Sequence, residues 1–125
     1  MEQLTKIKSR FGHIDVFINK EKTTLYAVPN GYVGPELVKK DLKFLKKFDA
    51  NCENKWKYIV DISKVKIVNP INPFLLNGLR QFSKMSTYIV YAPSPIVRIM
   101  LTLTSWINKP DKIIKQKEQL QRELK

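Results

Sequence analysis

The fold is decided by the stretch Lys57-Tyr58-Ile59-Val60-Asp61-Ile62, an almost continuous apolar run of strand length. Runs of this kind are typical of a strand that is covered on both faces of a mostly parallel sheet. Asp61-Ile62-Ser63 ends the strand, and residues 65–68 continue the chain as a short extended segment. The stretch therefore predicts the centre of an α/β sheet.

Toward the N-terminus, two kinds of periodicity precede this strand. Residues 13–19 alternate with the two-residue period of a half-buried strand, and residues 23–28 form a second run rich in β-forming residues. The polar turn between them predicts a β-hairpin. Residues 35–48 change to a helical period, with Pro35 in the first turn. The apolar stripe expected on this helix consists of Val38, Leu42, Leu45 and Phe48.

Toward the C-terminus, helices and strands alternate. The expected elements are a helix over 73–85, a strand over 87–92, a third helix over 95–108, a short edge strand over 111–115 and a terminal helix over 116–125, anchored mainly by Leu120 and Leu124. Alternating elements with short connections favour one mostly parallel sheet with right-handed crossovers. The sequence predicts an α/β fold: a single mixed, mostly parallel sheet of four to five strands, with an N-terminal hairpin and helices packed on it.

Length and composition set further limits. A chain of 125 residues fits one domain, 1–125, with enough apolar residues for one core. It has no apolar run of the length that a spanning helix needs and no apolar stretch of signal-peptide type at its N-terminus. A single cysteine, Cys52, cannot form an internal disulfide, which agrees with a reducing compartment. We therefore expect a cytoplasmic protein.

The net charge of +12 is spread along the chain, and Lys outnumbers Arg. It predicts either a solvated basic surface or a dedicated anionic partner, and residues 69–105 contain no acidic residue. Residues 55–58 interleave Lys with Trp and Tyr, as stacking platforms for single-stranded nucleic acid do. The same string is typical of the start of a strand that buries alternate aromatic residues.

The order of elements and three strings resemble the STAS family, and in particular its bacterial branch of anti-sigma-factor-antagonist-like (STAS/SEC14-like) domains. The strings are KTTLYAVPNG (22–31), WKYIVDIS (56–63) and EQLQREL (118–124). The resemblance covers nearly the whole chain and implies a switchable protein–protein interaction domain that is not an enzyme. In antagonist members a Ser in the turn before the second helix is phosphorylated. Here Asn69 and Pro70-Ile71 occupy that turn, so the resemblance implies a domain without the usual phosphorylatable serine.

Candidate binding residues gather after the central strand. Asp61 and Ser63 follow its carboxyl end, where open α/β sheets collect their ligands, and Asn69, Ile71 and Asn72 lie in the next loop. These five residues are the expected contacts of a partner or ligand. The alternative is that the Asp61 or Ser63 side chain closes a turn by bonding nearby backbone N–H groups.

The third helix is apolar nearly all round, and Arg98 is its one charged residue. Such a helix is either deeply packed or meets something else: a second copy in a homodimer, an apolar or lipid-like ligand, or an anionic membrane surface. Arg98 and Trp106 are its candidate contacts.

The residues that carry chemistry are sparse. His13 is the single histidine, Cys52 has no Cys or His at ligand spacing, and four glycines are too scattered for a phosphate-binding loop. We therefore expect no catalytic residues, no metal site and no cofactor. The leading hypothesis is a non-catalytic regulatory or adaptor domain that binds another protein. The alternatives are an apolar-ligand or lipid/membrane-surface binding domain and, third, electrostatic binding of nucleic acid.

Overall fold

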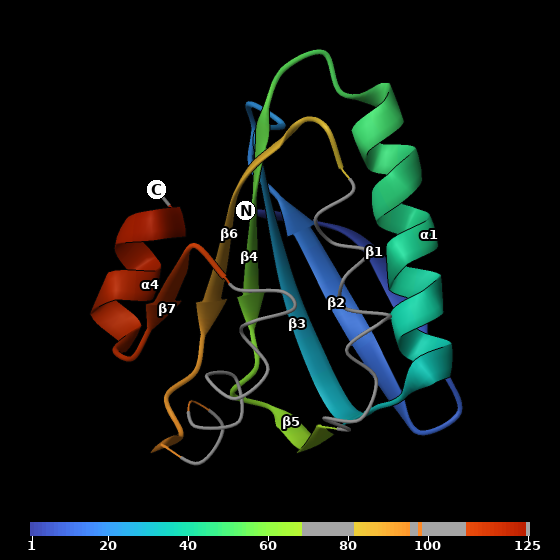
Figure 1. Cartoon of the computed structure of the whole chain (residues 1–125), viewed down its shortest axis with the longest axis vertical. Coiled ribbons are helices and arrows are strands. Elements are labelled where there is room, and N and C mark those ends of the chain that lie inside the picture. Colours follow the sequence, from blue (N-terminus) through green and yellow to red (C-terminus); the bar gives the residue numbers. More distant parts are fainter. Residues whose placement is uncertain (69–81, 96–97, 99–109, 125) are drawn as a thin grey trace.

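The structure is a computed structural model, and it describes residues 1–68, 82–95, 98 and 110–124. The elements within these residues follow the order of Figure 1. They are β1 (Glu2–Lys8), β2 (Gly12–Ile18), β3 (Thr24–Val33), α1 (Pro35–Asn51), β4 (Trp56–Asp61), β5 (Val65–Val68), β6 (Met85–Tyr91), β7 (Lys112–Ile114) and α4 (Lys117–Leu124). The helix expected over 73–85 lies outside the described residues as far as 81, and its predicted end is wrong, because residues 83–84 form a turn and β6 begins at Met85. Of the helix expected over 95–108, only residues 95 and 98 are described.

One mixed sheet organises the molecule. Six of its strands follow the order β1-β2-β3-β4-β6-β7, and β5 pairs with the end of β3 beside this path. β1, β2 and β3 pair antiparallel, whereas all pairings of β4, β5, β6 and β7 are parallel. The predicted α/β class, the N-terminal hairpin and the mostly parallel sheet are confirmed.

The sheet has more strands than the four to five that the sequence predicts, chiefly because the pattern of β1 hides a strand. Leu4 and Ile7 are three residues apart and lie on opposite faces, so Leu4 is exposed while Ile7 is buried, and a β-bulge inserts Leu4 as an extra residue between Gln3 and Thr5. The bulge breaks the two-residue alternation by which a half-buried strand is recognised. β5, expected as an extended segment, also joins the sheet.

The larger part of the core lies between α1 and one face of the sheet. Leu37 and Leu45 of α1 are completely buried, as is Trp56 of β4. The predicted stripe is correct at Leu45, which is buried, and at Leu42 and Phe48, which pack against the core. It omits Leu37, which is more deeply buried than Val38. Pro35 occupies the first turn of α1 as expected, and Glu36 places a carboxylate beside the positive end of the helix dipole.

α4 packs on the opposite face of the sheet, over β6 and β7. Its Leu120 joins a second cluster with Ile59, Ile89 and Ile114, as predicted for this anchor. The Glu123 carboxylate accepts hydrogen bonds from Lys112 Nζ at 2.9 Å and from Lys57 Nζ at 3.3 Å. These bonds lower the pKa of Glu123, and they hold α4 by charge as well as by apolar contact.

The two faces of β4 carry different parts of the core. Trp56 and Tyr58 face α1, and Ile59 faces α4. The central strand is therefore covered on both sides, as its sequence predicts. Within the described residues, no helix combines the length and the apolar composition needed to cross a membrane.

Candidate functional site

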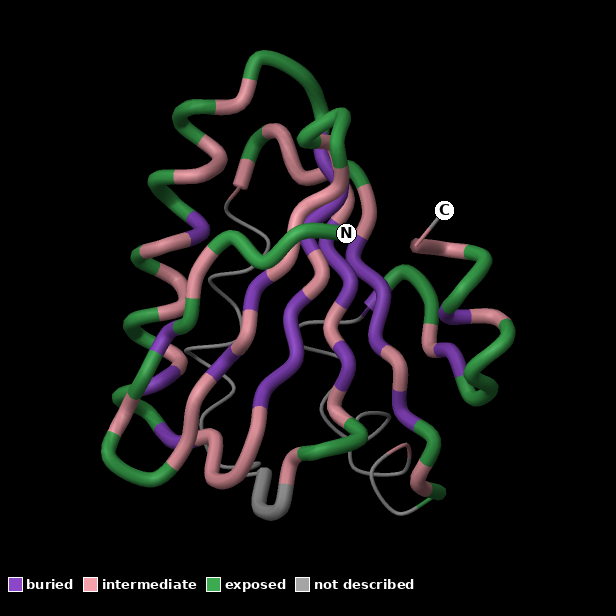
Figure 2. The backbone as a smooth tube through the Cα atoms, turned by 180° about the vertical axis from the view of Figure 1, so that it is seen from behind, coloured by how far each residue is buried: buried purple, intermediate pink, exposed green. Residues whose placement is uncertain are grey.

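We refer to the β1–β3 half of the sheet on the α4 side as the open half, because no helix among the described residues covers it. Figure 2 views the molecule from behind, and no described helix crosses in front of β1, β2 and β3. At the end of this open half, a hollow of about 460 Å³ lies between the β1–β2 turn, the end of β3 and the turn after β4. Ten residues line it: Lys6, Lys8, Ser9, Arg10, Phe11, Gly12, His13, Asn30, Gly31 and Lys64. We refer to it as the basic hollow.

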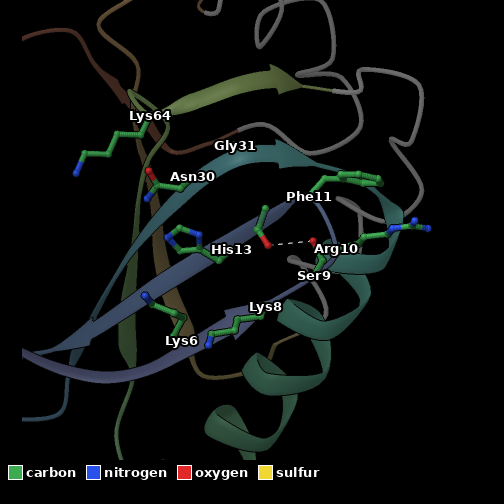
Figure 3. A pocket seen from close by; sticks show the side chains of 10 residues that line it. Lys6, Lys8, Ser9, Arg10, Phe11, His13, Asn30, Gly31 and Lys64 are labelled. Carbon is green, nitrogen blue, oxygen red and sulfur yellow. Dashed lines mark hydrogen bonds between the residues drawn. The ribbon is translucent and has the colours of Figure 1, made fainter.

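The strand register places four of these side chains in one row. Lys8 pairs with His13, and His13 pairs with Asn30 on β3. Lys64 directly precedes Val65, the partner of Gly31, so it continues the same row. Figure 3 shows the Lys64, Asn30 and His13 side chains following one another across the strands.

The hollow is strongly electropositive. Lys6 and His13 share one acid, Asp15, with separations of 3.6 Å and 3.5 Å from its carboxylate oxygens. Within the described residues, no ion pair joins a carboxylate to Lys8, Arg10 or Lys64. Three cations on one surface, each without a fixed counter-charge, produce a local positive potential that attracts anionic groups.

An exposed aromatic ring stands at the tip of the β1–β2 turn. The Phe11 side chain is 67% exposed, and the Arg10 guanidinium lies 5.3 Å from its ring centroid. This distance is within the range of a cation–π contact. The hollow therefore combines positive charge with an apolar edge.

Backbone hydrogen bonds fix the rim. Tyr32 N donates to Phe11 O at 3.2 Å, and Gly31 N donates to Lys64 O at 3.3 Å. Ser9 donates to Gly12 O from both its backbone N–H and its hydroxyl, the latter bond drawn in Figure 3. The turns that carry Phe11 and Lys64 are thus bonded to β3 and to themselves, which orders the surface in advance of binding.

Two glycines permit this close approach. Gly31 has a φ of +80°, a conformation that side-chain-bearing residues rarely adopt. A Cβ on Gly12 would lie 2.3 Å from the carbonyl oxygen of Tyr32 and 2.8 Å from that of Asn30. Both obstacles are backbone atoms, so the β1–β2 turn would have to move away from β3.

We therefore expect Gly12→Ala to lower the free energy of unfolding by at least about 2 kcal/mol, measured by chemical denaturation. Gly34→Ala is the matched control, because a Cβ there meets the side-chain ring of Tyr32, which can move. The control should cost less than half as much. Equal losses in the two variants would contradict the close approach at Gly12.

Of the predicted site residues, Asp61 bonds the turn that follows β4. The Asp61 carboxylate accepts the Ser63 backbone N–H at 2.9 Å with one oxygen and the Tyr26 hydroxyl at 2.8 Å with the other. Burial and this bond raise the pKa of Tyr26. Asp61 thus closes the turn, as the alternative interpretation proposes, and Ser63 is exposed within it. This turn also places Lys64 beside the basic hollow. Lys64 is not among the residues that the sequence predicts for the site.

The remaining predicted site residues lie beside or within the ranges that the structure does not describe. Arg98 Nη1 donates to the carbonyl oxygens of Ala92 at 3.0 Å and Pro93 at 2.8 Å, next to the start of the expected third helix. Asn69, Ile71, Asn72 and Trp106 lie outside the described residues. The basic hollow itself was missed, although alternating Lys6, Lys8 and Arg10 are typical of the solvent side of a strand.

The aromatic residues of 55–58 do not form a stacking surface. Trp56 is completely buried and Tyr58 is 2% exposed, so neither ring can receive a base. The interpretation of this string as the start of a strand is correct. In the described part of the chain, no group of three or more His, Cys, Asp or Glu could hold a metal ion.

Comparison with protein-family models gives no match, and comparison with curated proteins gives none either. Within the described residues, the fold and the basic hollow define the class of protein: an α/β domain with one mixed sheet that carries a positively charged hollow at one end of β1, β2 and β3.

Proposed function

We propose that the chain is a non-catalytic regulatory or adaptor domain that binds another protein through the open half of its sheet. The observation that carries the proposal is the basic hollow, a concave and ordered surface built from three strands and two turns. Ordering a surface before binding reduces the entropy lost on association. The resemblance to STAS domains, which implies regulatory protein–protein interaction, points to the same class of function.

The residue types on this surface suit a binding role. Exposed lysines, an arginine and an exposed phenylalanine surround the neutral floor residues Asn30 and Gly31. A protein interface commonly combines an aromatic or arginine anchor with a polar rim. Phe11 and Arg10 would supply the anchor here, and the lysines would supply the rim.

Blocking the floor of the hollow should abolish partner capture. Asn30 faces the hollow from β3, and Asn30→Trp would fill part of it with a ring that a strand tolerates. We expect immobilised wild-type protein to retain a partner from native lysate and Asn30→Trp to lose at least about nine-tenths of it. Quantitative mass spectrometry of the eluates measures this loss.

Asn54→Trp is the matched control. Asn54 is exposed and lies two residues before the start of β4, at the opposite end of the strand from the Lys64 turn. This variant should capture the same partner as wild type. Equal recovery by wild type and by folded Asn30→Trp would remove the open half of the sheet from the interface.

A further inference from the structure

The charges around the basic hollow specify the chemistry of what binds there. Lys8 and Lys64 stand at the two ends of the row that crosses β1, β2 and β3, and Arg10 stands at the adjoining turn. One acid on this face, Asp15, already lies between Lys6 and His13, and the buried Asp61 carboxylate already accepts bonds from Tyr26 and Ser63. A partner that places carboxylates beside Lys8, Arg10 and Lys64 would neutralise charges that the described residues leave without ion pairs.

We propose that the basic hollow receives an acidic segment of a partner protein, with carboxylates against this row and an apolar side chain against Phe11. This inference rests on the proposed function and names the chemistry of its partner. Lysine ammonium groups on flexible stems suit carboxylates that arrive on a flexible peptide, since they impose no fixed bidentate geometry. Phe11 is 67% exposed, so an apolar side chain that covers its ring would remove apolar surface from water and stabilise the complex.

The same features disfavour a nucleic-acid strand. Stacking platforms offer the open faces of aromatic rings to successive bases. Here one face of Phe11 lies under the Arg10 guanidinium, and Trp56 and Tyr58 are buried.

The edge of β1 is protected against a partner that would extend the sheet. The bulge between Gln3 and Thr5 disturbs the ladder near the beginning of the strand, and Lys40 Nζ donates to Lys8 O at 2.7 Å at its end. Bulges and lysines are devices by which edge strands avoid pairing with other chains. The acidic segment therefore lies on the face of the sheet.

Fluorescence anisotropy with a short labelled peptide of alternating Glu and Ser tests the proposal on the full chain. Lys8→Glu/Lys64→Glu should raise its dissociation constant by at least about tenfold. Lys43→Glu/Lys46→Glu changes the net charge equally at exposed positions of α1 and should raise it by less than about threefold. A peptide with one Leu at its centre should bind more tightly, and Phe11→Ala should remove that advantage.

Equal weakening by the two double variants would overturn the proposal, because it would show attraction to net charge alone. Tighter binding of a single-stranded oligonucleotide of the same charge, sensitive to Lys8 and Lys64, would overturn it in favour of nucleic acid.

Two further outcomes separate this inference from the proposed function. If Asn30→Trp abolishes partner capture while the Glu–Ser peptide fails to bind, the open face is an interface without acidic specificity. If the peptide binds at Lys8 and Lys64 while Asn30→Trp captures normally, the proposed function fails instead. Circular dichroism confirms that each variant folds.

Discussion

Asp41→Asn should stabilise the protein at about pH 8, and its advantage over wild type should shrink by about 2–3 kcal/mol when the pH falls to about 5. Asp41 lies on α1 between the buried Leu37 and Leu45, one helical turn from each. Its Oδ2 accepts the Tyr58 hydroxyl at 3.2 Å, whereas no described residue forms a hydrogen bond with its buried Oδ1. A carboxylate in this position lacks most of the solvation that it has in water.

The direction of the pH effect follows from proton uptake. Burial raises the pKa of Asp41 from 3.8 to about 7, and the Tyr58 hydrogen bond opposes that rise only in part. Between these two values the folded state holds a proton that the unfolded state has released, so stability falls as the pH rises through this window. Above about pH 7 both states are ionised, and the full penalty remains. Asn has no charge to bury, so the variant escapes the penalty.

Tyr58→Phe gives the opposite test. It removes the hydrogen bond that favours ionised Asp41, so stability should fall more steeply between about pH 5 and about pH 8 than in wild type. Glu36→Gln controls for loss of a negative charge from the same helix, because Glu36 is exposed. Urea denaturation at both pH values measures these differences. A constant gap between Asp41→Asn and wild type would show that Asp41 is ionised in the folded state throughout this range.

Local patterns were sufficient to predict the central strand, the hairpin and α1. Residues 57–62 are apolar almost without interruption because both faces of β4 are covered, by α1 on one side and by α4 on the other. Residues 35–48 carry a helical stripe because one side of α1 meets the sheet. In each case the burial that stabilises the element also determines the spacing of apolar residues from which the element is predicted.

The basic hollow could not be predicted in the same way, since it depends on contacts between distant segments. Lys8, His13, Asn30 and Lys64 come together through the antiparallel register of β1, β2 and β3 and the parallel addition of β5. A shift of one residue in any of these pairings would send side chains to the other face. The position of Asp41 could have been noticed, because it lies four residues from both Leu37 and Leu45 on the apolar side of the helix. That no described residue bonds its Oδ1 depends on how the core packs and is not visible in the sequence.

Trp56→Ala should produce the largest loss of stability among the changes considered, about 3–5 kcal/mol. Trp56 is completely buried, and its ring lies 5.2 Å from that of Phe48, 6.0 Å from Tyr58 and 6.2 Å from Phe82. Its Nε1 also donates to Asp49 Oδ1 at 2.8 Å. Because the same oxygen accepts the Lys84 backbone N–H at 3.1 Å, Trp56 links the end of α1 to the turn before β6.

Trp56→Phe separates the packing from the hydrogen bond. It keeps an aromatic ring in the cluster but removes the donor to Asp49, so it should cost about 1–3 kcal/mol, less than Trp56→Ala. Phe11→Ala removes an exposed ring and should change the free energy of unfolding by no more than about 0.5 kcal/mol. Urea denaturation followed by far-UV circular dichroism ranks the three variants. If Trp56→Phe cost as much as Trp56→Ala, the bond to Asp49 would outweigh the packing. If Trp56→Ala cost no more than Phe11→Ala, the Trp56 ring could not be at the centre of the core. A loss of about 3–5 kcal/mol is easily measured, because a domain of this size has only about 5–15 kcal/mol of stability in total.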